Sequence, residues 1–147
     1  MTTPYLDTSA LAKWYLNEEY SEAVEAYLAD LPSAQISSLT RIEFRCLLAR
    51  RRRYQDISSQ LEARILGQFH QDIRREHLQV LALTDAHVDS AMELMNRLSE
   101  HPLRTLDALH LALVLDAGLE TLATADRILA AAAEELGLTV ERFFPDR

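Results

Sequence analysis

Four acidic residues, each in a distinct local setting, could do chemistry if the fold brings them together. Asp7 ends a short apolar run, Glu43 lies in a predicted helix, Asp107 lies within the apolar segment 103–112, and Asp126 follows a predicted strand. Crowded carboxylates repel one another, and a bound divalent cation removes that conflict. Mg²⁺ and Mn²⁺ prefer oxygen ligands and usually keep several waters. The four acids therefore predict a carboxylate cage for such an ion, an arrangement suited to cleaving phosphodiesters.

Five further polar residues could complete this site: Thr8, Ser9, Arg104, His110 and Thr124. The three hydroxyls could hold the carboxylates or waters around an ion. His110 shares a helix face with Asp107 and could contact a phosphate or shuttle a proton, although a packed, hydrogen-bonded histidine is an equally good interpretation. Arg104 could contact a phosphate or pair with a carboxylate.

Each acid also has an ordinary structural interpretation. An aspartate at the end of a strand, such as Asp7 or Asp126, is usually a turn former or a helix cap. Glu43 alone would be a surface residue of its helix. Asp107 is harder to dismiss, because its helix is predicted to be largely buried and a buried acid needs a partner, which Arg104 could be. The occurrence of all four settings together favours the metal site.

The composition indicates one ordinary globular domain spanning residues 1–147. The chain has 48% hydrophobic and 26% charged residues, and its apolar stretches are shorter than the roughly 18 residues that a membrane span needs. No signal peptide is recognisable at the N-terminus. The single Cys46 excludes an internal disulfide and a thiolate metal site. These observations predict a cytoplasmic location.

The charge is unevenly distributed along the chain. The net charge of −8 argues against simple electrostatic binding of nucleic acid. Four consecutive arginines, Arg50 to Arg53, nevertheless follow Arg41 and Arg45, and guanidinium groups suit phosphate contacts. Such a run could equally lie on a solvated face, so its role stays open.

Short strands alternate with helices along the chain. Strands are predicted at 4–7, 34–37, 78–83, 119–124 and 139–143, and helices at 9–17, 20–31, 39–54, 57–75, 86–99, 105–117 and 127–136. Helix 39–54 could be capped by Ser37 or Ser38, and Gly118 and Gly137 should end two others. On helix 86–99 the apolar pattern predicts that Val88, Met92, Met95 and Leu98 face inward.

This alternation predicts an α/β fold, a three-layer α/β/α sandwich around a short, mostly parallel sheet. Ligands of such sheets gather beyond the carboxyl ends of the strands. Asp7 and Asp126 follow strands directly, whereas Glu43 and Asp107 lie near the starts of helices entered from the same edge. We therefore expect one edge of the sheet to carry all four acids.

With these motifs the chain resembles the PIN-domain ribonucleases, most closely the VapC-type toxins of bacterial toxin–antitoxin pairs. The segment Asp7 to Leu11 resembles the opening motif of the family, and Ser37 to Glu43 resembles the second. The segment Leu103 to Ala112 resembles the third motif, and Thr124 to Asp126 the fourth. The match covers nearly the whole chain, although the arginines at 50–53 are no part of a family signature.

The resemblance implies a PIN-like fold and Mg²⁺- or Mn²⁺-dependent cleavage of RNA. It makes Asp7, Glu43, Asp107 and Asp126 the catalytic, metal-binding acids, and a metal-activated water attacks the phosphodiester. It further implies a homodimer and a small antitoxin partner that blocks the acidic pocket.

Three other functions are weaker. A phosphotransfer receiver domain needs a lysine near its last strand, and the only lysine is Lys13. A phosphatase of the haloacid-dehalogenase type needs an aspartate two positions after Asp7, where Ser9 stands. A non-catalytic, PIN-like binding module remains the alternative, although the presence of all four acids argues against it. The target RNA is not indicated by the sequence.

Overall fold

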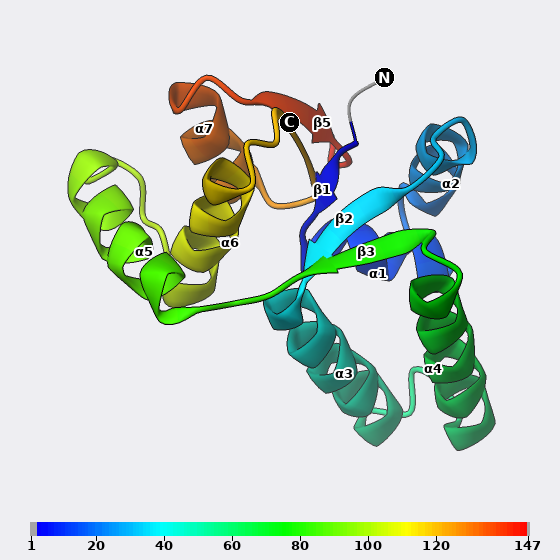
Figure 1. Ribbon diagram of the computed structural model, residues 1–147. Coiled ribbons are helices and arrows are strands. Elements are labelled where there is room, and N and C mark those ends of the chain that lie inside the picture. Colours follow the sequence, from blue (N-terminus) through cyan, green and yellow to red (C-terminus); the bar gives the residue numbers. More distant parts are fainter. Residues whose placement is uncertain (1–2, 147) are drawn as a thin grey trace.

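A single sheet of five parallel strands organises the computed structural model, which describes residues 3–146 (Figure 1). The strands are β1 (Tyr5–Leu6), β2 (Ala34–Ser37), β3 (Leu78–Leu81), β4 (Thr121–Thr124) and β5 (Thr139–Arg142). Their spatial order is β3-β2-β1-β4-β5. All four neighbouring pairs are parallel, so the predicted mostly parallel sheet is parallel throughout.

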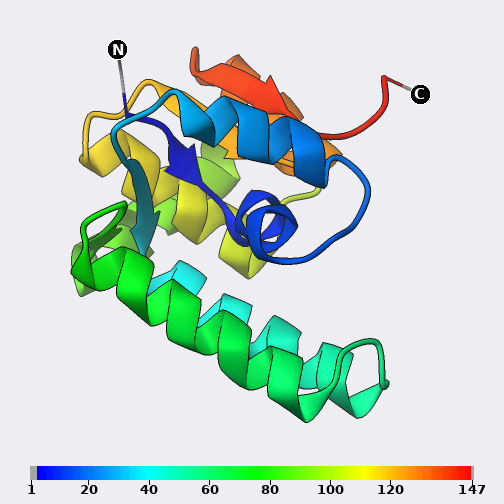
Figure 2. The ribbon, with the colours of Figure 1, turned by 90° about the vertical axis from the view of Figure 1, so that its right-hand side faces the viewer.

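Seven helices connect and cover these strands. They are α1 (Thr8–Tyr15), α2 (Ser21–Ala29), α3 (Ser38–Arg53), α4 (Ser59–Arg74), α5 (Asp85–Arg97), α6 (Thr105–Asp116) and α7 (Arg127–Glu135). Figure 2 shows α3 and α4 lying side by side as a long helical hairpin. Every predicted element is present, and its ends lie within two residues of the prediction.

Two apolar cores lie on the two faces of the sheet. Leu6 and Ala123 point into the core covered by α1 to α4, whereas their neighbours Tyr5 and Leu122 point into the core covered by α5 to α7. This follows from strand geometry, because successive side chains of a strand point to opposite faces. The arrangement confirms the predicted three-layer α/β/α sandwich.

Polar caps and glycines define where the helices begin and end. The Ser37 hydroxyl accepts a hydrogen bond from the Thr40 amide and caps α3, so Ser37 rather than Ser38 is the cap. Gly118 and Gly137 follow α6 and α7 with φ of +68° and +86°. Glycine adopts this left-handed conformation without steric cost, as expected for a residue that ends a helix.

The predicted inward face of α5 is wrong by one residue. Three side chains expected in the core are exposed: Val88 (44%), Met92 (65%) and Met95 (42%). The helix buries His87, Ala91, Leu94 and the correctly predicted Leu98 instead. Both sets have helical spacing, so periodicity alone could not separate them. Contacts with the rest of the structure select the buried face, because the His87 ring bonds to the Thr84 amide and to the Asp116 carboxylate of α6.

None of the helices formed by residues 3–146 combines the length and the apolar character needed to cross a membrane.

Candidate active site at the carboxyl edge of the sheet

The four predicted acids line one cleft beyond the carboxyl ends of the central strands. Ten residues surround this cleft of about 490 Å³: Asp7, Thr8, Ser9, Glu43, Arg104, Thr105, Leu106, Asp107, His110 and Asp126. Four different helices contribute the acids, with Asp7 and Asp126 as N-caps of α1 and α7, Glu43 in α3 and Asp107 in the first turn of α6. The fold thus brings together residues that are up to 119 positions apart. We refer to this region as the acidic cleft.

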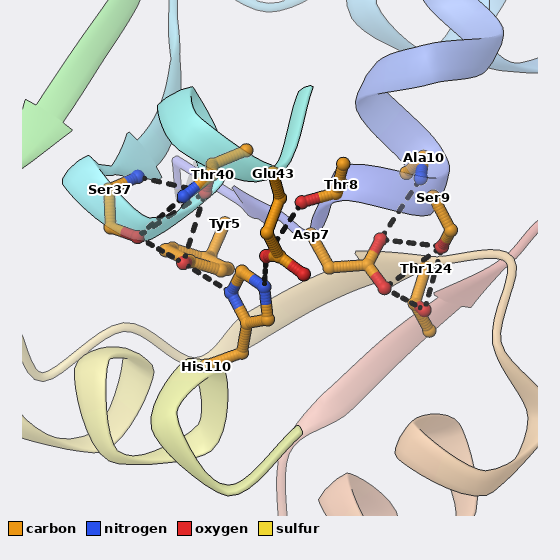
Figure 3. Close-up of polar contacts among 10 residues, drawn as sticks. All are labelled: Tyr5, Asp7, Thr8, Ser9, Ala10, Ser37, Thr40, Glu43, His110 and Thr124. Atoms are coloured by element: carbon orange, nitrogen blue, oxygen red, sulfur yellow. Dashed lines mark hydrogen bonds and ion pairs between the residues drawn. The ribbon is translucent and has the colours of Figure 1, made fainter. Parts of the chain in front are cut away.

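Asp7 is the most deeply buried of the four acids, with 5% of its surface exposed (Figure 3). Its Oδ1 accepts a hydrogen bond from the Ala10 amide at 3.0 Å, and its Oδ2 accepts one from the Thr124 hydroxyl at 2.6 Å. The Ser9 hydroxyl lies 2.7 Å and 2.9 Å from the two oxygens. Burial raises the pKa of the Asp7 carboxyl, and the charge of His110 together with these hydrogen bonds offsets part of the rise. A carboxylate has about four acceptor positions, so three donors leave one for a further ligand.

Glu43 is held by two donors at a single oxygen. The Thr8 hydroxyl donates to Oε1 at 2.9 Å, and His110 Nε2 lies 2.6 Å from the same atom. Burial pushes the pKa of Glu43 upward, but the hydrogen bond and charge of His110 and the bond from Thr8 outweigh it, so the pKa is lowered. The glutamate is therefore ionised at neutral pH, and no residue in the described part of the chain bonds to its Oε2.

Asp107 and Asp126 each bond to backbone amides through one oxygen. Asp107 Oδ2 accepts from the Arg104 amide at 3.0 Å, and Asp126 Oδ1 accepts from the Ile128 and Leu129 amides at 2.8 Å and 3.1 Å. The capping role predicted as the ordinary alternative for Asp7 and Asp126 is therefore real. A capping role is compatible with a functional one, because capping uses only one carboxylate oxygen. The other oxygen of Asp126 forms no hydrogen bond with residues 3–146.

The accessory residues occupy the places that the sequence suggested, with one difference. Thr8, Ser9 and Thr124 hold the carboxylates of Glu43 and Asp7. The expected alternative of an ion pair between Arg104 and Asp107 is wrong, because only the Arg104 backbone bonds to that acid and its exposed side chain makes no ion pair with the residues described. The guanidinium is therefore available to a ligand of the cleft.

His110 is a packed, hydrogen-bonded histidine, the second of the two interpretations that the sequence left open. Only 3% of the residue is exposed, and both ring nitrogens are engaged. Nε2 contacts Glu43, and Nδ1 lies 2.7 Å from the hydroxyl of the fully buried Tyr5. An ionised carboxylate only accepts hydrogen bonds, so Nε2 carries a proton and donates it. His110 thus orients Glu43 and does not face the cleft as a free base.

Sequence reasoning missed the three residues behind His110. The Tyr5 hydroxyl also contacts the Ser37 hydroxyl at 2.8 Å and the Thr40 hydroxyl at 3.4 Å. Burial raises the pKa of Tyr5, and the bonds from Ser37 and Thr40 reduce the rise, so the phenol stays neutral. One signal was available, because a tyrosine in a buried strand needs a partner for its hydroxyl.

The donor atoms of the acidic cleft fit a hard divalent cation. Glu43, Asp107 and Asp126 each have a carboxylate oxygen without a partner among the described residues, and Asp7 retains one acceptor position. Within residues 3–146, no three His, Cys, Asp or Glu side chains are arranged to hold an ion by themselves. The oxygens without a protein partner suit a hard divalent cation whose coordination is completed by water or phosphate oxygens.

We predict that Tyr5→Phe lowers the RNA-cleaving activity expected from the sequence without unfolding the protein. Loss of the hydroxyl leaves His110 Nδ1 without its 2.7 Å partner and frees the ring that orients Glu43. Removing such an outer contact costs on the order of 10-fold in activity and about 1–3 kcal/mol in stability. Tyr27→Phe is the matched control, since the Tyr27 ring packs on Phe143, outside the cleft. Equal kcat values for the two variants and the unaltered protein would show that Tyr5 does not position Glu43.

Comparison with known proteins places this geometry in a family. Residues 5–135 match the model of the PIN domain. The chain therefore belongs to the PIN domain family. No match is found among the curated proteins.

Several solved structures share the fold. VapC20 of Mycobacterium tuberculosis, described as a toxin that cleaves the sarcin–ricin loop, is 20% identical, with a TM-score of 0.71 over 88% of this chain and 95% of that chain. FitAcB of Neisseria gonorrhoeae is 17% identical, with a TM-score of 0.68 over 95% and 96% of the two chains. DNA-bound VapBC of Salmonella typhimurium is 19% identical, with a TM-score of 0.66 over 97% and 99%.

Proposed function

We propose that this protein is a Mg²⁺- or Mn²⁺-dependent endoribonuclease and the toxin of a type II toxin–antitoxin pair. The observation that carries the proposal is the convergence of Asp7, Glu43, Asp107 and Asp126 on one cleft with carboxylate oxygens left unpaired. Membership of the PIN domain family and the fold shared with a toxin described as cleaving the sarcin–ricin loop support it.

The residues of the cleft have separate roles in this proposal. The four acids would hold the ion, and a bound ion would supply a water of lowered pKa and neutralise charge on the phosphate. Thr8, His110 and Tyr5 keep Glu43 in one orientation, and the hydroxyls of Ser9 and Thr124 do the same for Asp7. The exposed Arg104 contacts a phosphate of the RNA, which a guanidinium can bind through two parallel hydrogen bonds.

The same comparison supports a proposal about the partners. Structures of FitAcB, of DNA-bound VapBC and of a toxin–antitoxin complex from Klebsiella pneumoniae share this fold, and we propose that a small antitoxin covers the acidic cleft of this protein. We further propose a homodimer, a single domain over the whole chain and a cytoplasmic location.

The test is cleavage of RNA by the purified, antitoxin-free protein with Mn²⁺ or Mg²⁺. A panel of structured cellular RNAs that includes the sarcin–ricin loop should give discrete fragments with 5′-phosphates. We expect EDTA to abolish cleavage and added Mn²⁺ to restore it, because the carboxylates repel each other and the phosphate when no cation is present. Cleavage that persists in EDTA would contradict the proposal. Absence of both cleavage and calorimetric Mn²⁺ binding would favour the non-catalytic binding module.

A further inference from the structure

The positive charge of this acidic protein is concentrated on the α3–α4 hairpin. Residues 38–76 contain nine arginines and five acidic residues, a net charge of +4, whereas the remainder has six basic and eighteen acidic residues, a net charge of −12. The hairpin extends from the body of the molecule (Figures 1 and 2), and α3 begins directly where β2 ends. A polyanion would be repelled by most of the molecular surface and attracted to this hairpin.

Part of the arginine run has a structural role. Arg51 bonds to Glu18 at 3.0 Å, and Arg52 bonds to Glu62 at 2.8 Å. Glu62 is only 8% exposed and also bonds to Arg45 at 3.1 Å. A buried carboxylate requires such partners, so Arg51 and Arg52 stabilise the hairpin and its contact with the body. They are not the residues that a ligand would meet first.

A groove between the two helices contains part of the available positive charge. Elsewhere on the same hairpin, Arg50, Arg53, Arg64, Arg74 and Arg75 are also exposed and form no ion pair within residues 3–146. The groove has a volume of about 330 Å³. Its walls include Arg41, Ile42, Arg45, Leu66, Phe69 and His70. Arg41 is exposed and forms no ion pair with any residue the structure describes. Arg45 keeps 48% of its side chain exposed, and one guanidinium nitrogen binds Glu62. We call this groove the basic groove.

The basic groove and the acidic cleft lie on two sides of α3. Arg41 faces the groove and Glu43 faces the cleft. The two residues are about 3 Å apart along the helix axis and point to nearly opposite sides of it. Ile42, which is 58% exposed, lies between them around the helix. A strand whose phosphate sits at Glu43 can therefore continue over Ile42 into the groove.

We propose that the basic groove binds the sugar–phosphate backbone of the RNA next to the scissile phosphate, with Arg41 as the main phosphate contact. This inference rests on the proposed ribonuclease function. Arg41 offers a planar fork of donors that matches a phosphate, and Arg45 adds a second positive charge. The apolar side chains of Leu66 and Ile42 accommodate the ribose and base. RNA is favoured over an acidic polypeptide because only the helix α3 separates the groove from a cleft suited to phosphodiester chemistry.

The test compares Arg41→Gln with Arg97→Gln, an equal change of charge in the last turn of α5 that lines neither the cleft nor the groove. Binding of a fluorescein-labelled single-stranded RNA is measured by anisotropy in EDTA over a series of salt concentrations. Losing one phosphate contact reduces the slope of log K against log salt by about 0.7 for a single strand. We expect this reduction for Arg41→Gln, an unchanged slope for Arg97→Gln, and retention of the slope in Arg41→Lys, which keeps the charge. Equal melting temperatures would confirm that the exposed substitution leaves the fold intact.

Equal slopes for Arg41→Gln and Arg97→Gln would overturn the inference. So would a competition experiment in which poly-glutamate binding depends on Arg41 while RNA binding does not, because the groove would then serve an acidic protein partner. Cleavage assays with Mn²⁺ separate this result from the proposed function. If Arg41→Gln leaves the slope unchanged while cleavage is intact, only the proposed role of the groove is rejected. If RNA binding depends on Arg41 but the unaltered protein does not cleave RNA, only the proposed nuclease activity is rejected.

Discussion

We expect Asp7→Asn to abolish RNA cleavage while leaving the protein folded. Asp7 is the most deeply buried acid of the cleft, and the substitution removes its carboxyl group with little change in shape. Loss of an outer contact to a metal ligand already costs 10–100-fold, so loss of a ligand itself should lower kcat/KM by on the order of 100-fold or more. The Ser9 and Thr124 hydroxyls can rotate to accept bonds from the amide, which preserves the local structure.

The same substitution should not lower stability when no metal is present. Because burial raises the pKa of Asp7, its stabilising contribution is greatest below the unfolded pKa and is lost as pH rises through the folded pKa. Above the unfolded pKa the buried carboxyl therefore lowers the stability of the fold relative to low pH, and a neutral amide, which does not titrate, removes this cost. In EDTA we expect the variant to melt at the same temperature as the unaltered protein or higher.

Metal binding and a surface control complete this experiment. Mn²⁺ should raise the melting temperature of the unaltered protein, since a ligand of the folded state stabilises it, and should raise that of Asp7→Asn less. Asp89→Asn, a matched change at an exposed position of α5, should behave like the unaltered protein in both assays. Normal cleavage by Asp7→Asn would contradict the assignment of the site.

The largest effect on stability is expected from Phe44→Ala. Phe44 is fully buried in α3, and its ring packs 5.4 Å from the ring of Tyr15 and 5.0 Å from that of Phe69. Truncating a buried phenylalanine costs about 3–5 kcal/mol, a large part of the 5–15 kcal/mol of a typical domain. Urea denaturation should show this loss, and the melting temperature should fall by roughly 10 °C or more.

Ile42→Ala is the control for this prediction, because Ile42 lies two residues away on the same helix and is 58% exposed. It should change the free energy of unfolding by less than about 0.5 kcal/mol. Alanine has a higher helix propensity than either residue, so similar losses for both variants would contradict the assignment of this stability to the burial of Phe44. Near-neutral behaviour of Phe44→Ala would show that the aromatic cluster does not hold α3 and α4 on the sheet.

Features that depend on neighbouring residues could be read from the sequence. The ends of α6 and α7 at Gly118 and Gly137, and a cap of α3 at Ser37 or Ser38, follow from local capping chemistry. The positions of Asp7 and Asp126 follow from a general rule, since parallel strands present their carboxyl ends at one edge.

Features that depend on long-range packing could not be read in this way. The face that α5 buries was ambiguous, because His87 and Val88 begin equally regular helical series and the contact with α6 selects between them. The ion-pair partners of Arg51 and Arg52 could likewise not be predicted from the sequence. Glu18, the partner of Arg51, is 33 residues away, and Glu62, the partner of Arg52, lies on the other helix of the hairpin.

The sequence by itself therefore determined the order of strands and helices, the three-layer fold and the four acids, because periodicity, caps and strand ends are local properties of the chain. Only the tertiary structure decided that His110 is buried between Tyr5 and Glu43, contacts that span 105 and 67 residues. Only the tertiary structure distinguishes Arg51 and Arg52, which form ion pairs, from Arg41, which lines the basic groove. Hydrogen bonds and ion pairs between distant residues require a particular packing of α3, α4 and α6, and local sequence carries no information about which donor will meet which acceptor.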